Sequence, residues 1–287
     1  VVYADFANGK FSVGNSVPLD TDDTAQLYKA LVFGIKDYFS KMGFSHALLG
    51  SSGGIDSAVV QALASAALGG ENVHPVLMPS MFSSDHSVND AETLSKNLGN
   101  ETITLPIKNI YDQYLETLQP VFAGKAFNLA EENLQARSRA VLLMAISNKM
   151  GYILLNTSNK SELSVGYSTL YGDLCGALSV IGDVYKNQVY ALARYINRNS
   201  EIIPNNIIVK APSAELRPGQ KDSDSLPEYD VLDELLKHYI EERKGVEELI
   251  TMGYETAVVN KVVALVNCEN ANVCEEPANV NKNSGLQ

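Results

Sequence analysis

The sequence predicts an α/β protein: a doubly wound, mostly parallel sheet with helices on both faces and extra helices at the C-terminal end. Two patterns support this fold class. Short apolar runs alternate with amphipathic stretches from residue 21 to residue 156, as expected for consecutive βαβ units. After residue 230 the apolar residues recur only at helical spacing, which indicates helices without further strands.

The first expected helix begins at Thr21, where two aspartates follow, and carries apolar residues at helical spacing up to Phe39. The expected strands are residues 46–49, 73–78, 102–107 and 152–156. The expected helices between and after them are residues 57–68, 90–98 and 133–150. In such sheets ligands bind at the carboxyl ends of the strands, so the loops that leave the strands are the candidate site.

The remaining segments differ in composition. Residues 159–187 and the Pro-, Asp- and Ser-rich stretch 211–230 are expected to be irregular loops, followed by helices at 230–243, 246–252 and 256–266. We interpret residues 1–20 as an N-terminal arm or linker and 21–266 as the functional domain. Residues 267–287 contain six Asn and little apolar periodicity, and are expected to be a disordered tail.

Composition limits the class of protein. The chain has 22 basic and 34 acidic residues, a net charge of -12, which argues against a nucleic-acid-binding surface. A phosphate ligand would therefore need local donors and a divalent metal. Three scattered cysteines fit a reducing cytoplasm without a disulfide framework or zinc site. No apolar run reaches the roughly 18 residues of a membrane span, and the absence of an initial Met suggests processing or a fragment.

The most specific local feature is a glycine-rich segment between an expected strand and helix, with the sequence Gly50-Ser51-Ser52-Gly53-Gly54-Ile55-Asp56-Ser57. Glycines allow a tight turn and close approach of a ligand, and N–H groups at a helix start suit an oxyanion. No Gly-Lys-Ser/Thr follows, so the segment is not a Walker A loop. A glycine-rich turn with a Ser/Asp cap is the alternative when the loop is taken alone.

The sequence from Ser52 to Ser57 resembles the pyrophosphate loop of the N-type ATP pyrophosphatases. The resemblance implies the adenine nucleotide alpha hydrolase-like fold and cleavage of ATP between its α- and β-phosphates. This loop alone does not distinguish synthetases for GMP, asparagine, argininosuccinate or NAD, or tRNA-modifying enzymes.

Later segments distinguish among these families. Residues 131–139 open the long helix, with Asn133 and Arg137 four apart on one face, where they could clamp one ligand. Residues 155–162 leave a strand, and residues 167–173 end in Asp173, which could orient a ribose or a base. Together with residues 79–92, 183–186 and 211–218, these segments resemble NAD synthetase, and more closely the synthetase domain of its glutamine-dependent class.

The resemblance implies that deamido-NAD, ATP and ammonia give NAD, AMP and pyrophosphate through an adenylated intermediate. It assigns Asp56 and Glu162 as the catalytic residues that hold Mg²⁺. The implied ATP contacts are Gly50, Ser51, Ser52, Gly53, Gly54, Ile55, Asp56, Ser57, Thr157, Lys186 and Ser213. The implied deamido-NAD contacts are Asn133, Arg137, Glu162 and Asp173. Residues 80–86 resemble a mobile loop that closes over the reactants, in which His86 is expected to be solvated rather than a base.

Two features depart from the glutamine-dependent class. Nothing in the 287 residues supplies its nitrilase-like glutaminase domain, so the chain is expected to be a fragment, or to use free ammonia or ammonia from a partner protein. Residues 267–276 are acidic where the family has basic residues, which puts turnover in doubt. The alternatives are a non-catalytic nucleotide-binding or assembly module and another amidating enzyme such as GMP synthetase, which residues 133–137 and 171–173 disfavour. The family implies a homodimer or a larger assembly.

Overall fold

The computed structural model describes residues 4–13 and 21–269. The strands are β1 Ala4–Ala7, β2 Lys10–Val13, β3 Ala47–Gly50, β4 Val73–Leu77, β5 Ile103–Thr104, β6 Ile153–Asn156 and β7 Leu178–Ser179. The α-helices are α1 Asp23–Met42, α2 Ile55–Leu68, α3 Asp85–Leu98, α4 Lys108–Phe122, α5 Leu129–Met150, α6 Lys160–Ser164, α7 Lys186–Ile196, α8 Asn205–Val209, α9 Tyr229–Leu236, α10 Val246–Thr251 and α11 Thr256–Glu269. Single 3-10 turns are η1 Gly70–Asn72 and η2 Asp222–Asp224, and a π-helical turn is η3 Lys237–Glu241.

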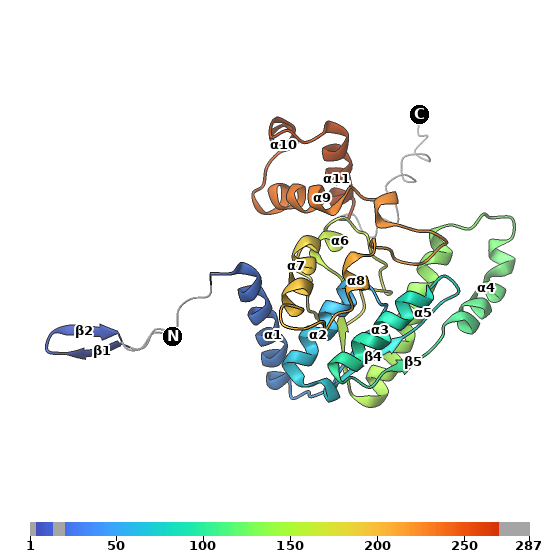
Figure 1. Cartoon of the computed structure of the whole chain (residues 1–287). Coiled ribbons are helices and arrows are strands. Elements are labelled where there is room, and N and C mark those ends of the chain that lie inside the picture. The colour runs from blue at the N-terminus through green and yellow to red at the C-terminus, as the bar shows by residue number, and fades with distance from the viewer. Residues whose placement is uncertain (1–3, 14–20, 270–287) are drawn as a thin grey trace.

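The main sheet has five strands in the order β5-β4-β3-β6-β7, and every neighbouring pair is parallel. From β3 the chain moves outward through β4 to β5, then crosses back to β6 on the other side of β3 (Figure 1). The loops leaving β3 and β6 therefore diverge in opposite directions, which opens a crevice at the carboxyl ends of these strands. This is where the fold places a ligand.

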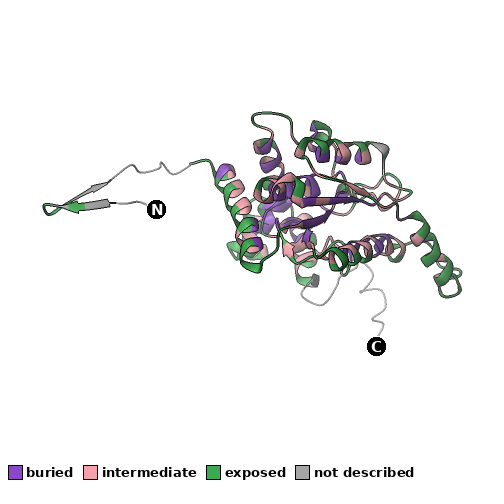
Figure 2. Cartoon of the chain, turned by 90° about the horizontal axis from the view of Figure 1, so that it is seen from below, coloured by how far each residue is buried: buried purple, intermediate pink, exposed green. Residues whose placement is uncertain are grey.

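The strands alternate their side chains between two cores, because successive residues of a strand point to opposite faces. Leu49 and Leu155 pack into the core formed with α1, α2 and α7. Leu48 and Leu154 pack on the other face, against Leu143 of α5. Figure 2 shows the buried strands as the middle layer between helices. The predicted doubly wound fold with helices on both faces is confirmed.

The long helices begin where the sequence provides capping side chains. Asp22 Oδ1 accepts the backbone N–H of Thr24 at 2.9 Å, so α1 begins where predicted. Helix α5 begins four residues before the predicted position 133, because Asn128 caps it. The Glu131 carboxylate in turn accepts the Asn128 N–H at 2.9 Å.

The extra C-terminal helices are also confirmed. Helices α9, α10 and α11 enclose a separate core that includes Leu232, Leu236, Leu249 and Val259. This core also takes in Tyr185, which precedes α7, and Figure 1 shows α9, α10 and α11 gathered beyond α6 and α7. Helix α11 continues to Glu269, so residues 267–269 are helical rather than part of a disordered tail. The rest of that predicted tail lies outside the described residues.

Several elements were not predicted. Within the expected arm, residues 4–13 form an antiparallel hairpin that turns at Asn8 and Gly9, both with positive φ, as an Asn-Gly turn requires. Residues 159–187, expected to be irregular, contain the short helix α6 and strand β7. Helices α4 and α7 were also missed. Within the described part of the chain, no helix has the length and apolarity needed to cross a bilayer.

Candidate functional site

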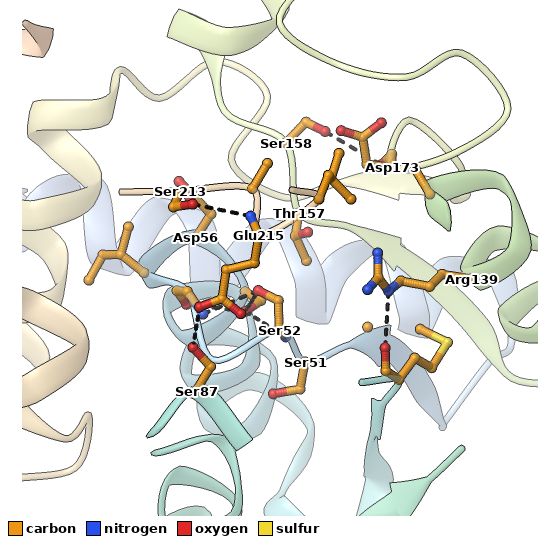
Figure 3. A pocket seen from close by; sticks show the side chains of 18 of the residues that line it. Ser51, Ser52, Asp56, Ser87, Arg139, Thr157, Ser158, Asp173, Ser213 and Glu215 are labelled. Atoms are coloured by element: carbon orange, nitrogen blue, oxygen red, sulfur yellow. Dashed lines mark hydrogen bonds between the residues drawn. The ribbon is translucent and has the colours of Figure 1, made fainter. Parts of the chain in front are cut away.

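A cavity of about 310 Å³ lies at the carboxyl ends of β3, β4 and β6, beneath the segment 210–216 (Figure 3). The sequence-predicted residues that line it are Gly50, Ser51, Ser52, Gly54, Ile55, Asp56, Ser57, Thr157, Glu162, Asp173, Lys186 and Ser213. Gly53 belongs to the same loop but does not line the cavity, and neither do Asn133 and Arg137. The structure thus brings together residues from five separate segments of the sequence.

The loop between β3 and α2 is shaped by its own hydroxyl groups. Ser52 Oγ accepts the N–H of Gly54 at 3.2 Å and lies 3.1 Å from Ser57 Oγ. Gly54 stands at the N-cap of α2, where it provides no side-chain acceptor for the first-turn N–H groups. An uncapped helix start beside a cavity is suited to an oxyanion, because the N–H groups and the positive end of the helix dipole face the ligand.

A buried lysine joins the two carboxylates assigned to a metal. Lys186 Nζ lies 2.6 Å from Asp56 Oδ2 and 2.9 Å from Glu162 Oε1, and the lysine side chain is only 2% exposed. Burial alone would lower the pKa of Lys186, but the two carboxylates outweigh it and raise this pKa above its usual range. Lys186 therefore remains charged and holds both carboxylates at one point.

For Glu162, burial has a larger effect on the pKa than the neighbouring lysine has. Desolvation raises its pKa to about 7, although Lys186 acts in the opposite direction. The second oxygen of Asp56 accepts a bond from Asn159 Nδ2 at 2.8 Å. Asn159 also caps α6, through a bond from the Glu162 N–H at 3.0 Å. The cap that starts α6 thus sets the positions of both carboxylates.

A third carboxylate lies nearby, which the sequence reasoning missed. Asp222, in the 3-10 turn η2, accepts from the Tyr229 hydroxyl at 2.9 Å and from the Tyr167 hydroxyl at 3.2 Å. The Tyr229 hydroxyl lies 3.5 Å from Glu162 Oε1, and the centroid of the Tyr229 ring lies 5.1 Å from Lys186 Nζ. Burial raises the pKa values of Asp222 and of both tyrosines. No short sequence motif marks this network, because its members are far apart in the chain.

Asp173 reaches the cavity from the loop that follows residue 167. Its carboxylate accepts the backbone N–H of Thr169, so the loop folds around its own side chain. Burial raises the pKa of Asp173 to about 6, and the backbone N–H donors only partly oppose this shift.

Asn133 and Arg137 of α5 form hydrogen bonds with the loop of residues 167–173 on its side away from the cavity. Asn133 Oδ1 accepts from the Thr169 hydroxyl at 2.7 Å, and Arg137 Nε donates to the Leu170 carbonyl at 3.2 Å. The predicted sharing of one helix face is found, but that face meets the 167–173 loop instead of opening into the cavity.

Arg139 lines the cavity and was missed (Figure 3). Its Nε donates to the Met78 carbonyl at 3.1 Å, at the end of β4. Burial lowers its pKa to about 10, against the influence of Glu215 and Asp173. Arg139 falls within the buried stripe Ala136, Ala140 and Leu143 of α5, and an arginine in an apolar stripe was the signal that could have identified it.

The predicted mobile loop 80–86 leads into α3. Ser84 caps this helix by accepting the Ser87 N–H at 3.2 Å, and His86 is exposed, as expected for a solvated residue.

The donor set fits a small divalent cation. Asp56 and Glu162 offer hard carboxylate oxygens that already meet around one positive charge. No three-residue cluster of His, Cys, Asp or Glu was found in residues 4–13 and 21–269, so a cation there would complete its shell with ligand oxygens and water.

The chain resembles known proteins over most of its length. The family model described as NAD synthase matches residues 27–271. The glutamine-dependent NAD(+) synthetase of Synechocystis is 53% identical over 91% of this chain and 47% of its own length. The corresponding protein of Thermotoga maritima is 50% identical over 88% of this chain and 44% of its own length.

Solved structures agree with these matches. The glutamine-dependent NAD+ synthetase of Acinetobacter baumannii, in complex with adenosine diphosphate, has a TM-score of 0.70 and 41% identity over 92% of this chain and 48% of its own. The NH3-dependent NAD synthetase of Campylobacter jejuni has a TM-score of 0.71 and 28% identity over 90% of this chain and 98% of its own. The chain thus spans about half the length of its glutamine-dependent relatives.

Proposed function

This chain belongs to the NAD synthase family, and on that premise we propose that it catalyses ATP-dependent amidation of deamido-NAD. Deamido-NAD, ATP and ammonia would give NAD, AMP and pyrophosphate. The supporting observation is the meeting of the glycine loop, Asp56, Glu162 and Lys186 in one cavity at the carboxyl ends of the central strands.

The chemistry needs alignment and charge stabilisation more than a protein nucleophile. The substrate carboxylate attacks the α-phosphorus of ATP, pyrophosphate leaves, and ammonia then displaces AMP from the activated carbonyl. The residues from Gly50 to Ser57 would bind the departing pyrophosphate through hydroxyl and N–H donors. Lys186, Thr157 and Ser213 would contact ATP from the other walls.

Magnesium is part of the proposal. Asp56 and Glu162 would hold it, and when bound it would supply positive charge that offsets the phosphates. Lys186, which pairs with both carboxylates, would then be available to a phosphate oxygen.

On the substrate side, we propose that Glu162 and Asp173 contact deamido-NAD directly, because both line the cavity. Asn133 and Arg137 would hold the wall formed by residues 167–173. Exclusion of water by this wall and by residues 80–86 would protect the adenylate from hydrolysis.

The remaining parts of the proposal concern the whole protein. Residues 21–266 would form the synthetase domain, working as a homodimer in the cytoplasm. Its relatives are about twice as long, which supports a nitrilase-like glutaminase domain as the ammonia source in a full-length form.

One assay tests the proposal. The chain is incubated with ATP, Mg²⁺, deamido-NAD and ammonium, and NAD, AMP and pyrophosphate are quantified. Equal amounts of NAD and AMP are expected, whereas ADP would contradict adenylation and nucleotide binding without products would indicate a non-catalytic module. GMP formation from xanthosine monophosphate would indicate GMP synthetase. As a control, Asp56→Asn is expected to abolish turnover with an unchanged circular dichroism spectrum.

A further inference from the structure

Glu215 binds the start of helix α3 across a long sequence separation. Its Oε1 accepts the hydroxyl of Ser87 at 2.6 Å and that of Ser84 at 3.2 Å, and Oε2 accepts the Ser84 N–H at 3.3 Å. These three donors, at the positive end of a helix, compensate the carboxylate charge. A negative side chain is therefore accommodated beside the glycine loop.

Ser87 connects this contact to the glycine loop. Gly53 has φ +75°, and a Cβ built on it would lie 2.2 Å from the Ser87 carbonyl oxygen, so the loop and α3 are in direct backbone contact. On its other side, Ser87 Oγ lies 3.0 Å from Lys210 Nζ. Ser87, which is buried, thus contacts the glycine loop, the Glu215 carboxylate and Lys210, the residue just before the segment 211–218.

The backbone of Glu215 fixes a residue assigned to ATP. The Glu215 N–H donates to Ser213 Oγ at 3.1 Å, and Ser213 lines the cavity (Figure 3). Glu215 itself has φ +51°, a left-handed conformation that is unfavourable for a residue with a Cβ and is maintained only when surrounding contacts enforce it. After it, the Leu216 carbonyl accepts from Gln135 Nε2 of α5 at 2.9 Å.

We propose that Glu215 is a positioning residue for ATP. Its side chain anchors the segment 211–218 to α3, and its backbone holds Ser213 at the cavity, so Glu215, which also lines the cavity, acts on ATP through the position of Ser213. The proposal rests on the proposed function, because it assumes that ATP occupies this cavity.

The first experiment measures ATP–Mg²⁺ affinity by calorimetry for the wild type, Glu215→Ala, Glu215→Gln, Ser213→Ala and the double variant Ser213→Ala/Glu215→Ala. We expect Glu215→Ala to weaken ATP binding about tenfold, as for loss of a charged hydrogen-bond anchor, and Glu215→Gln, which keeps one acceptor oxygen, to weaken it less. Glu228→Ala, an exposed glutamate at the start of α9, is the matched control and should change affinity less than about twofold.

The double variant distinguishes positioning from independent contacts. If Glu215 acts through Ser213, then Ser213→Ala adds less than about twofold in the Glu215→Ala background, because coupled residues are not additive. Unchanged affinity of Glu215→Ala, or fully additive losses, would overturn the proposal.

A second measurement does not depend on ATP. Amide hydrogen exchange of the ligand-free protein should rise in residues 211–218 and 84–88 of Glu215→Ala and stay unchanged in α9. Unchanged exchange in residues 211–218 would reject the anchoring role. If the wild type fails to bind ATP, the proposed function is wrong, and the exchange experiment still decides whether Glu215 anchors the segment.

Discussion

Lys186 determines the charge balance at the centre of the site. It is one ammonium between two carboxylates, so the cluster keeps a negative charge when all three groups are ionised. Such a cluster is costly to bury and is stable only with its partners in place. The same surplus of negative charge favours a divalent cation.

Lys186→Met tests this charge balance, because it should lower the stability of the protein in a way that depends on Mg²⁺. Removing one partner of a buried pair typically costs about 3–5 kcal/mol, and Mg²⁺ should restore part of this loss by replacing the ammonium. The measurement is thermal unfolding at pH 8 with and without Mg²⁺.

Lys160→Met is the matched control. Lys160 also pairs with two carboxylates, Asp183 at 2.7 Å and Glu241 at 2.8 Å, but these partners are 92% and 41% exposed. Exposed pairs contribute about 1 kcal/mol or less. Equal losses in the two variants, or no response of Lys186→Met to Mg²⁺, would contradict this account.

Asp173 gives stability a defined pH dependence. Its pKa in the folded protein is about 6, against 3.8 as the ordinary value. A raised carboxyl pKa means that the folded state holds the proton more tightly, so this contribution is complete below pH 3.8 and is lost as the pH rises through 6. The Asp173 side chain is exposed, and solvent screening reduces this contribution to about 1 kcal/mol or less.

Asp173→Asn should remove the pH-dependent contribution of Asp173 to the free energy of unfolding. Denaturant unfolding of both proteins across pH 4–7 is expected to give a flatter profile for the variant. Parallel profiles would mean that Asp173 titrates normally.

The sequence identified the residues that lie within compact motifs. Asp56 and Glu162 both line one cavity, because their motifs follow strands β3 and β6, which are parallel neighbours in the sheet. Asn159 and Asp222 were not identified. Their roles depend on partners 103 and 55 positions away, and no local pattern encodes such distances.

At the scale of elements, the shortest helices and strands were missed, and so were the longer helices α4 and α7. Helices α1, α2 and α5 have 20, 14 and 22 residues and each ends at a glycine, and all were predicted near their observed positions. Helix α6 has only five residues and strand β7 only two. Such short elements are held by tertiary contacts, such as the bond between Ser161 of α6 and Asp233 of α9, rather than by propensity.

The contact between the glycine loop and α3 gives a prediction at this scale. Gly53→Ala should lower the free energy of unfolding by about 2–4 kcal/mol, because alanine disfavours a positive φ and its Cβ would collide with the Ser87 carbonyl.

Gly54→Ala is the comparison, measured by the same denaturant titration. Gly54 has φ -86°, and its added Cβ would lie 3.2 Å from a rotatable serine hydroxyl. A smaller loss is therefore expected. Similar losses at the two positions would show that α3 does not restrict the loop.

The whole molecule combines an acidic surface with a site built from donors. The net charge of -12 disfavours an anionic ligand at long range, yet the cavity presents an uncapped helix start, Arg139 and Lys186. Binding of an anion in this cavity would therefore depend on these local donors and not on the overall charge. The overall charge was known from the sequence, whereas Arg139 was not expected in the cavity.

A polypeptide of these 287 residues should use ammonium directly. NAD formation is expected to saturate with ammonium concentration, and glutamine at the same concentration should not replace it, because the matched family region alone spans residues 27–271. Both nitrogen sources are compared in one assay. Equal rates with glutamine would show that this polypeptide hydrolyses glutamine itself.

The ion pair between Lys186 and Asp56 also has a consequence for folding. It joins positions 130 apart, and it forms only after α2, α6 and α7 have docked on one another. Closing such long loops is slow compared with forming local helices. A partly folded chain can contain the glycine turn but not the pair of Lys186 with Asp56. Recovery of the proposed nucleotide binding after refolding would therefore mark the last steps of assembly, and a bound nucleotide would stabilise only the finished fold.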